Sequence, residues 1–509
     1  MFFTTVQTYN TCYCIHKTQS RTKLQVRRVW TLAVEPGFTT GMRELEELIG
    51  GIRGPYMLLI VGHPGAGKST LASQICYVNA LKGHKCLYMS FYESKEKLFR
   101  NVAKLGINLV EAENKGLLVH VKLPVAATQE VLDTISRLVT KDSYRVVVVD
   151  SINPLMDFLK RKEQRAILLN FFYNLVDAIS GLLVVVSEVP LGKEALSLGS
   201  IEFVADAIVY LKHRVSRGLV TRILEIRKVR GAPLTVVEVP FSIINVKGLR
   251  VYLPPRPERP LATLAERLKS REAISSILGP IYAGDIISIS HPPSARDKRT
   301  NAPFVDIAVE NDLKALVISY KYSRTELREI AFSLLTKYFE LGEREANWVI
   351  DSYMHFESVN PASFSTPELA ALEHELIETL NPGIVVFHGC EVPWKMIRDL
   401  GEGEYWSQLI NQLTWLKNKG VLVVRHIGRV DPHFTRMNES LSDVTIRVHY
   451  RYEDGVVKPV WKAWRRGGEP LLIDFTSGEV IGKIKEFNEW FRGLIKEKML
   501  KSEIASHST

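Results

Sequence analysis

The sequence predicts an α/β protein with two tandem domains, each built on a mostly parallel central sheet that helices cover and that ends in a β-hairpin. Three observations lead to this prediction. Short apolar strands alternate with helical patterns in the first half, which is typical of a buried parallel sheet. A proline-rich stretch interrupts the chain near its middle. After that stretch, the same order of elements returns.

The composition is that of an ordinary globular protein. Of the 509 residues, 46% are hydrophobic and 24% are charged, which excludes a largely disordered chain. Lys and Arg number 66 against 56 Asp and Glu, and the resulting net charge of +10 permits a nucleic-acid partner without requiring one. No apolar run reaches the roughly 18–20 residues of a transmembrane helix. The five cysteines match no zinc or disulfide framework, so we expect free thiols and a cytoplasmic location.

Five segments follow from the pattern along the chain. They are a basic N-terminal arm (1–34), a first domain (35–253), a proline-rich linker (254–270), a second domain (271–482) and a basic C-terminal helix and tail (483–509). Four prolines within residues 254–260 cannot continue a helix or a central strand, which places the boundary there. The apolar residues of the last segment recur at helical spacing, and packing on its own domain is favoured over membrane contact.

The first half contains the clearer alternation. Strands are expected at 56–61, 85–91, 116–122, 144–149 and 181–187, with helices at 68–82, 94–105 and 164–180 and a further helix before the fourth strand. Residues 205–213 and 221–228 flank a turn that contains Gly218, which predicts an antiparallel hairpin. This order favours a doubly covered sheet with a hairpin at its end.

The second half repeats this order in a diverged form. Strands are expected at 284–290, 316–319, 383–387 and 420–424, followed by a hairpin around Gly455. The segment KCLYMSFYES (85–94) parallels KALVISYKYS (314–323), and the Gly-His-Pro that begins at Gly62 parallels the Ser-His-Pro that begins at Ser290. We interpret the halves as two copies of one fold.

A phosphate-binding loop joins the first expected strand to its helix. It fits G-x-x-x-x-G-K-[ST] in full, and with the next residue it comprises Gly62, His63, Pro64, Gly65, Ala66, Gly67, Lys68, Ser69 and Thr70. The glycines let successive N–H groups face phosphate oxygens at the helix N-terminus. Lys68 is expected to bind the phosphates of ATP and to act in catalysis, and Ser69 to bind Mg²⁺. A tight turn alone leaves Lys68 unexplained.

Two carboxylates follow neighbouring strands. Asp150 ends the apolar run 146–149 and is expected to hold Mg²⁺ at the carboxyl edge of the sheet. Glu93 follows the strand 85–91 and is the candidate that positions the attacking water. The structural alternatives are a helix cap for Asp150 and a first-turn acid for Glu93.

With these motifs, the first half resembles a KaiC-type ATPase of the RecA superfamily. The likeness covers about residues 36–254 and includes 37–41, 45–51, 203–206 and a K-x-R-G element at 228–231. The resemblance implies two tandem RecA-like P-loop domains and a homo-oligomeric, often hexameric ring with ATP between subunits. It also implies that Lys228 and Arg230 reach the γ-phosphate of ATP on a neighbouring subunit. Without the resemblance, these two residues read as a cationic strand face.

The chain departs from the family pattern in both halves. Where the family has two adjacent glutamates, this chain has Tyr92 and Glu93, so Glu93 has to substitute and hydrolysis is expected to be slow. In the second half, the counterpart of the phosphate loop has no glycine and contains Asp297. Lys321 and Tyr322 replace the glutamates there, and His388 or Gly389 replaces the aspartate. We expect this half not to bind ATP-Mg²⁺ in the usual way.

The sequence thus predicts an ATP-binding, ATP-hydrolysing regulatory or signalling protein with a degenerate second domain and an unidentified client protein. One alternative is a non-hydrolysing assembly switch or scaffold, which the Tyr92-Glu93 pair favours. Another is a DNA-dependent ATPase of the RecA/RadA type, which the absence of a helix-hairpin-helix segment ahead of the core disfavours. The histidines of the second half have no metal-ligand spacing.

Overall fold

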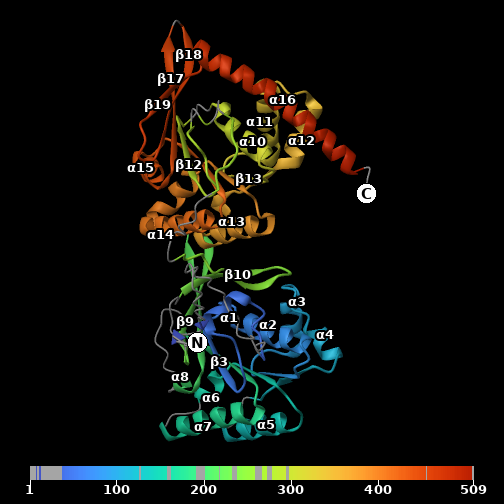
Figure 1. Cartoon of the computed structure of the whole chain (residues 1–509). Helices are drawn as coiled ribbons and strands as arrows, with labels where there is room; N and C mark the ends of the chain where they lie inside the picture. The colour runs from blue at the N-terminus through green and yellow to red at the C-terminus, as the bar shows by residue number, and fades with distance from the viewer. Residues whose placement is uncertain are drawn as a thin grey trace, which may run out of the picture. The chain divides into compact units, whose positions relative to one another are not determined.

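The structure is a computed structural model. It describes residues 7–8, 11–12, 37–124, 128–157, 162–190, 201–216, 218–231, 238–257, 266–271, 275, 278–293, 297–453 and 455–506. The chain divides into two compact units, the first formed by Met1–His213 and Arg222–Val251, the second by Arg214–Thr221 and Tyr252–Thr509. Each unit has its own sheet (Figure 1). Most of the expected N-terminal arm lies outside the described residues, apart from the short pair β1 (Gln7–Thr8) and β2 (Thr11–Cys12).

The first unit is built on a nine-stranded sheet in the order β11-β10-β9-β8-β3-β7-β6-β4-β5. The strands are β3 (Tyr56–Gly62), β4 (Cys86–Ser90), β5 (Leu118–Lys122), β6 (Val146–Asp150), β7 (Leu182–Glu188), β8 (Ala207–Ser216), β9 (Leu219–Val229), β10 (Glu238–Ile244) and β11 (Gly248–Val251). The strands from β8 to β5 pair in parallel, whereas β9, β10 and β11 pair antiparallel. The expected hairpin is present as β8 and β9.

Helices cover both faces of this sheet, as its apolar strands require. They are α1 (Arg43–Ile49), α2 (Lys68–Leu81), α3 (Lys95–Ala103), α4 (Leu109–Asn114), α5 (Thr128–Thr140), α6 (Asn153–Asp157), α7 (Lys162–Ile179) and α8 (Ile201–Val204). Ile135 of α5 and Phe172 of α7 are buried in one apolar cluster with Leu59 and Val149. Helix α2 lies on the other side of β3 from α5 and α7 (Figure 1). On α2, Gln74 bonds both backbone groups of Leu249 in β11, at 2.9 and 3.1 Å.

The second unit repeats this topology. Its eight strands lie in the order β14-β13-β15-β16-β12-β17-β18-β19, which reproduces the order β5-β4-β6-β7-β3-β8-β9-β10 of the first unit. They are β12 (Ile286–His291), β13 (Ala315–Ser319), β14 (Met354–Ser358), β15 (Ile384–His388), β16 (Leu422–Gly428), β17 (Val444–Glu453), β18 (Val456–Arg465) and β19 (Leu471–Asp474). The prediction of two tandem α/β domains is therefore confirmed.

The helices of the second unit differ in length from those of the first. They are α10 (Ala302–Glu310), α11 (Arg324–Lys337), α12 (Glu343–Tyr353), α13 (Thr366–Leu380), α14 (Glu391–Asn418), α15 (Pro432–Leu441) and α16 (Gly478–Ser506), with 3₁₀ turns at Lys298–Asn301 and Pro361–Ser363. The C-terminal helix α16 packs on its own unit, because Phe491 and Ile495 are buried against Phe339 and Val349. Among the described residues, none of the helices combines the length and apolarity needed to cross a membrane.

Strand register corrects the alignment of the two halves by one residue. In the first unit Ser90 lies opposite Asp150, and in the second Ser319 lies opposite His388. Likewise Gly62 faces Glu188, whereas His291 faces Gly428. The shared His-Pro dipeptide had suggested Ser290 as the counterpart of Gly62. Backbone pairing places His291 there instead, because the register of a buried parallel sheet fixes which residue ends each strand.

Gly181 offers a test of the first sheet in which the second unit serves as an internal control. It precedes β7, and a Cβ at this position would collide with the backbone carbonyl of Arg145. We expect Gly181→Ala to lower the free energy of unfolding of the first unit by about 1–3 kcal/mol. Seven of the eight tryptophans lie in the second unit. In urea, far-UV circular dichroism should therefore show that the first unit of the variant unfolds at a lower concentration than in the wild type. The midpoint followed by tryptophan fluorescence, which reports mainly on the second unit, should not change.

Gly37→Ala is the matched control, because a Cβ placed there has no described atom within 4 Å apart from those of its chain neighbours. This variant should unfold like the wild type. Equal stability of Gly181→Ala and Gly37→Ala would contradict the close approach of these strands.

Candidate functional site

The loop between β3 and α2 has the backbone of a phosphate-binding loop. Gly65 and Gly67 have φ values of +76° and +102°, a left-handed region that glycine enters without steric cost. Gly62 is required for a different reason, since a Cβ there would lie 2.5 Å from the carbonyl oxygen of Leu211 in β8. Helix α2 then begins at Lys68 with no side-chain cap at its N-terminus. Its first N–H groups therefore remain available to an anion.

Lys68 is buried at the start of α2, with only 5% of its side chain exposed. Its Nζ donates a hydrogen bond to the carbonyl oxygen of His63 at 2.9 Å and lies 3.6 Å from a carboxylate oxygen of Glu188. Burial lowers the pKa of Lys68, and the charges of Glu188 and Asp150 partly oppose this. A buried ammonium group held by one carbonyl and one half-exposed carboxylate can exchange them for phosphate oxygens.

Asp150 ends β6 and is also buried. The hydroxyl of Tyr88 donates a hydrogen bond to its carboxylate at 2.7 Å, and the Ser69 hydroxyl is a second hydrogen-bonding partner. Burial raises the pKa of Asp150, against the effects of Tyr88, Ser69 and Lys68. The structure therefore brings together the two oxygen groups expected to hold Mg²⁺.

These two groups fit the requirements of Mg²⁺. This ion prefers oxygen ligands and is commonly held by one or two protein oxygens together with substrate phosphates and water. Among the described residues there is no cluster of three or more His, Cys, Asp or Glu side chains that could form a complete metal cage. The hydroxyl of Ser69 and the carboxylate of Asp150 beside the loop match a magnesium ion that arrives with a nucleotide.

Glu93 lies at the same edge, just beyond β4. Its backbone N–H donates to Ser90 Oγ at 3.1 Å, and its carboxylate lies 3.5 Å from Lys97 Nζ with 29% of the side chain exposed. It is near enough to Asp150 to contribute to the raised pKa of that carboxyl. Tyr92, by contrast, is 59% exposed. Of the pair, Glu93 is the acidic group close to Asp150.

Glu188 is a residue of this site that the sequence analysis missed. It ends β7, directly opposite Gly62, and its backbone is held by the Asn153 side chain through two hydrogen bonds of 2.7 and 2.9 Å. Glu188 follows directly after the expected strand 181–187. The rule that carboxyl ends of parallel strands meet at one edge could have identified it.

Lys228 and Arg230 do not join the other predicted site residues within the chain. The Nζ of Lys228 donates to the carbonyl oxygens of Glu202 and Phe203 at 2.8 and 3.1 Å. Arg230 forms an ion pair of 3.1 Å with Asp206, whose carboxylate also accepts the N–H of Met57. Met57 is near the amino end of β3, whereas the loop follows its carboxyl end. The five residue steps from Met57 to Gly62 correspond to about 17 Å of strand.

The second unit has different chemistry at each corresponding position. Counted from the same register, Asp297 stands in the place of Lys68, Tyr322 in that of Glu93 and His388 in that of Asp150. Asp297 is buried and accepts hydrogen bonds from Arg299 at 2.7 and 2.8 Å and from Trp461 Nε1 at 3.0 Å. The residue at this position is therefore a carboxylate paired with Arg299, which cannot bind phosphate as a lysine would.

Comparisons with known proteins find a likeness to KaiC-type ATPases in the first half of the chain. A family model described as "ATPase: KaiC" matches residues 38–256. The chain is 25% identical over 321 residues to the circadian clock protein KaiC3 of Synechocystis sp., covering 57% of this chain and 62% of that protein. It is 25% identical over 219 residues to the circadian clock oscillator protein KaiC of Parathermosynechococcus lividus, covering 42% of this chain and 38% of that protein. The match thus spans less than two thirds of either relative's length.

The buried carboxylate of Asp150 predicts a pH-dependent stability effect in the nucleotide-free protein. Because burial raises its pKa, Asp150 costs stability wherever it is ionised in both the folded and the unfolded state. This cost should grow as the pH rises from the ordinary Asp value through the raised one. Asp150→Asn keeps an oxygen for Tyr88, so it should raise the urea midpoint at about pH 7.5, and the gain should disappear below about pH 4.

The matched control is Asp142→Asn. Lys85 bonds to Asp142 and lowers the pKa of that carboxyl, so this substitution should give no gain at neutral pH. A loss of stability in Asp150→Asn at neutral pH would mean that Lys68 and Tyr88 more than compensate for burial of the charge.

Proposed function

Because residues 38–256 form a KaiC-like ATPase domain of the RecA superfamily, we propose that the protein binds ATP with Mg²⁺ in its first unit and hydrolyses it as a regulatory or signalling ATPase. The observation that carries this proposal is the convergence of Lys68, Ser69, Asp150 and Glu93 at one edge of the sheet. We also propose that the protein acts on a client protein, which is not identified, and that it is located in the cytoplasm.

In this proposal each group has one task. The N–H groups of residues 65–70 and the Nζ of Lys68 bind the phosphates, in place of the carbonyl of His63 and the carboxylate of Glu188. Ser69 and Asp150 hold Mg²⁺, which would neutralise charge on the phosphate oxygens. Glu93 orients the attacking water and accepts its proton, since its partly exposed carboxylate is close enough to Asp150 to raise the pKa of that carboxyl.

Lys228 and Arg230 are proposed to act on the neighbouring subunit of a ring. Their position near the amino end of β3 is too far from the loop of the same chain for a direct phosphate contact. The Arg230 side chain is 55% exposed, and Phe203 beside it is 77% exposed, as expected of a surface that a second copy covers. A head-to-tail ring brings such a surface to the loop of the next subunit.

A non-hydrolysing assembly switch is the second candidate. Two observations favour it: Tyr92 occupies the first position of the usual glutamate pair, and Glu93 lies within 3.5 Å of Lys97. In that case nucleotide binding would change the assembly state without turnover.

Turnover measurements separate the two candidates. Lys68→Ala should abolish ATP binding, because its removal leaves the phosphates without a buried cation. Glu93→Gln should keep ATP binding and lower kcat by about 10²-fold or more, the usual contribution of a general base. Glu96→Gln on the exposed face of α3 is the matched control and should leave kcat unchanged. Equal kcat for wild type and Glu93→Gln, with sizing that still responds to ATP, would favour the switch.

Mixing two inactive variants tests the action across subunits. A Lys68→Ala chain still offers Arg230, and an Arg230→Ala chain still offers an intact loop. In rings assembled from equal amounts, roughly a quarter of the interfaces should be complete and turnover should partly return. Lys68→Ala mixed with Asp150→Asn should show no recovery, because both residues belong to the same loop site. Single-stranded DNA should not stimulate either mixture; salt-sensitive stimulation would support a DNA-dependent ATPase instead.

A further inference from the structure

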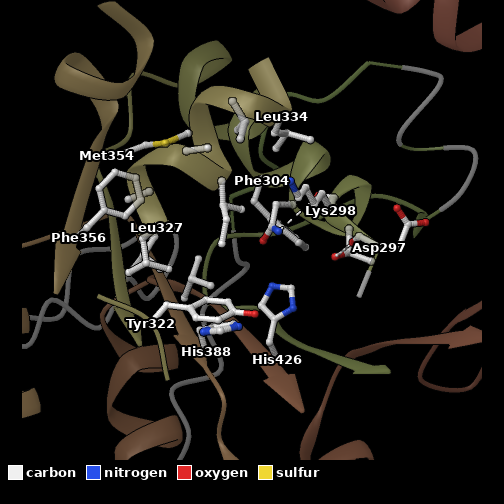
Figure 2. Close-up of a pocket in the computed structure, with 18 of the residues that line it drawn as sticks. Asp297, Lys298, Phe304, Tyr322, Leu327, Leu334, Met354, Phe356, His388 and His426 are labelled. Carbon is white, nitrogen blue, oxygen red and sulfur yellow. Dashed lines mark hydrogen bonds between the residues drawn. The ribbon is translucent and has the colours of Figure 1, made fainter. Parts of the chain in front are cut away.

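The second unit contains a cavity of about 180 Å³ at the carboxyl edge of its sheet. Its wall is apolar and comes from β13, β14, α10 and α11, whereas the residues at its mouth are polar. Figure 2 shows Tyr322, His388 and His426 together on one side, with Leu334, Met354 and Phe356 away from them. The mouth lies where the first unit has Ser69, Glu93 and Asp150. The cavity thus occupies the place of the magnesium site and extends into the core.

One difference between the two units removes an aromatic ring at the position of the cavity. In β4, the side chain of Tyr88 is fully buried, stacks on His120 and reaches Asp150 with its hydroxyl. By register, the counterpart of Tyr88 in β13 is Val317, which lies opposite Phe356 as Tyr88 lies opposite His120. Val317 lines the cavity and is the one partly exposed residue of an otherwise buried strand. The second unit therefore lacks a phenol ring that the first unit has.

The volume agrees with this missing ring. An apolar cavity of about 150 Å³ binds benzene, so about 180 Å³ accepts one aromatic ring with a small substituent. The wall supplies aliphatic and aromatic contacts from Phe304, Leu327, Leu334, Met354 and Phe356. A void of this size lowers stability unless it is filled, which favours an apolar ligand.

The mouth indicates the chemistry of the ligand's polar end. Its titratable groups are His291, Asp297, Lys298, Tyr322, His388 and His426. The carboxylate of Asp297 is already neutralised by two hydrogen bonds from Arg299. The ring of His388 is held in place by Ser319 Oγ at 2.9 Å and by stacking on Tyr322 at 5.0 Å between ring centroids. With Asp297 paired to Arg299, Lys298 adds a positive charge at this end of the cavity, which suits a single negative charge on the ligand.

We propose that this cavity binds a small aromatic carboxylate. The ring takes the volume that Tyr88 fills in the first unit, and the carboxylate lies at the mouth beside His388 and Lys298. A nucleotide does not fit this description, because this unit lacks the glycine-rich loop and has Asp297, paired with Arg299, in place of the phosphate-binding lysine. The inference concerns the second unit alone and does not depend on hydrolysis in the first.

The probe is 4-methylbenzoate, with the neutral 4-methylbenzamide as its isostere, added to the full chain. Of nine methionines, Met354 lines the cavity, so a ¹³C-methyl label gives a local signal that Met354→Leu assigns. The carboxylate should shift the Met354 methyl resonance and bind at least tenfold more tightly than the amide. Equal affinity of the two compounds, or no shift at Met354, would overturn the proposal.

Val317→Tyr restores the ring of the first unit and should therefore fold. It should raise the unfolding midpoint of the second unit, followed by tryptophan fluorescence, and abolish the Met354 shift. Lys298→Gln should weaken binding of 4-methylbenzoate about five- to tenfold and leave the amide unchanged, whereas Lys337→Gln on the exposed end of α11 should change neither. Binding that survives Val317→Tyr would contradict the assignment.

The last experiment adds ATP to the Lys68→Ala variant, in which we expect the first unit no longer to bind ATP. ATP should leave the Met354 shift caused by 4-methylbenzoate unchanged. Displacement of the probe by ATP would overturn the proposal in favour of a retained nucleotide site.

Discussion

The parallel pairing of β4, β6, β7 and β3 is the constraint on which the candidate site depends. Each strand ends at the same edge of the sheet. The order and direction of the strands therefore bring together residues that are far apart in the sequence. Ser90 lies opposite Asp150, and Gly62 lies opposite Glu188. The apolar runs within these strands hold the register, because a slip by one residue would turn the buried side chains to the opposite face.

This edge combines burial and charge in a way that opposes stability. Lys68 and Asp150 are both buried. Burial lowers the pKa of Lys68 and raises that of Asp150, which favours the neutral form of each group. The loop keeps an ammonium and a carboxylate in place without giving either a close ion pair, since the ion pair of Lys68 with Glu188 is 3.6 Å long. Groups held in this state gain most when a phosphate and a cation arrive together, which is typical of functional sites.

Much of the fold and site could be predicted from the sequence. The loop and Asp150 could be predicted because the spacing of glycines and a polar residue at the end of an apolar run are local patterns in the sequence. Glu188 was missed because its role depends on strand order, which places β7 beside β3 although more than a hundred residues separate them. The positions of Lys228 and Arg230 relative to the loop were equally non-local. The cavity beside Val317 could not be predicted, since a missing side chain leaves no pattern in a single strand.

Asp206 has a consequence for a ring. One of its oxygens accepts the N–H of Met57 at 2.9 Å, and the other pairs with Arg230 at 3.1 Å. If Arg230 moves to a neighbour's phosphate, Asp206 loses that partner while it still holds the start of β3. The far end of β3 leads directly into the loop of its own subunit. In the ring that we propose, occupancy of one site would then affect the next site through β3, which is a short route to cooperativity between subunits.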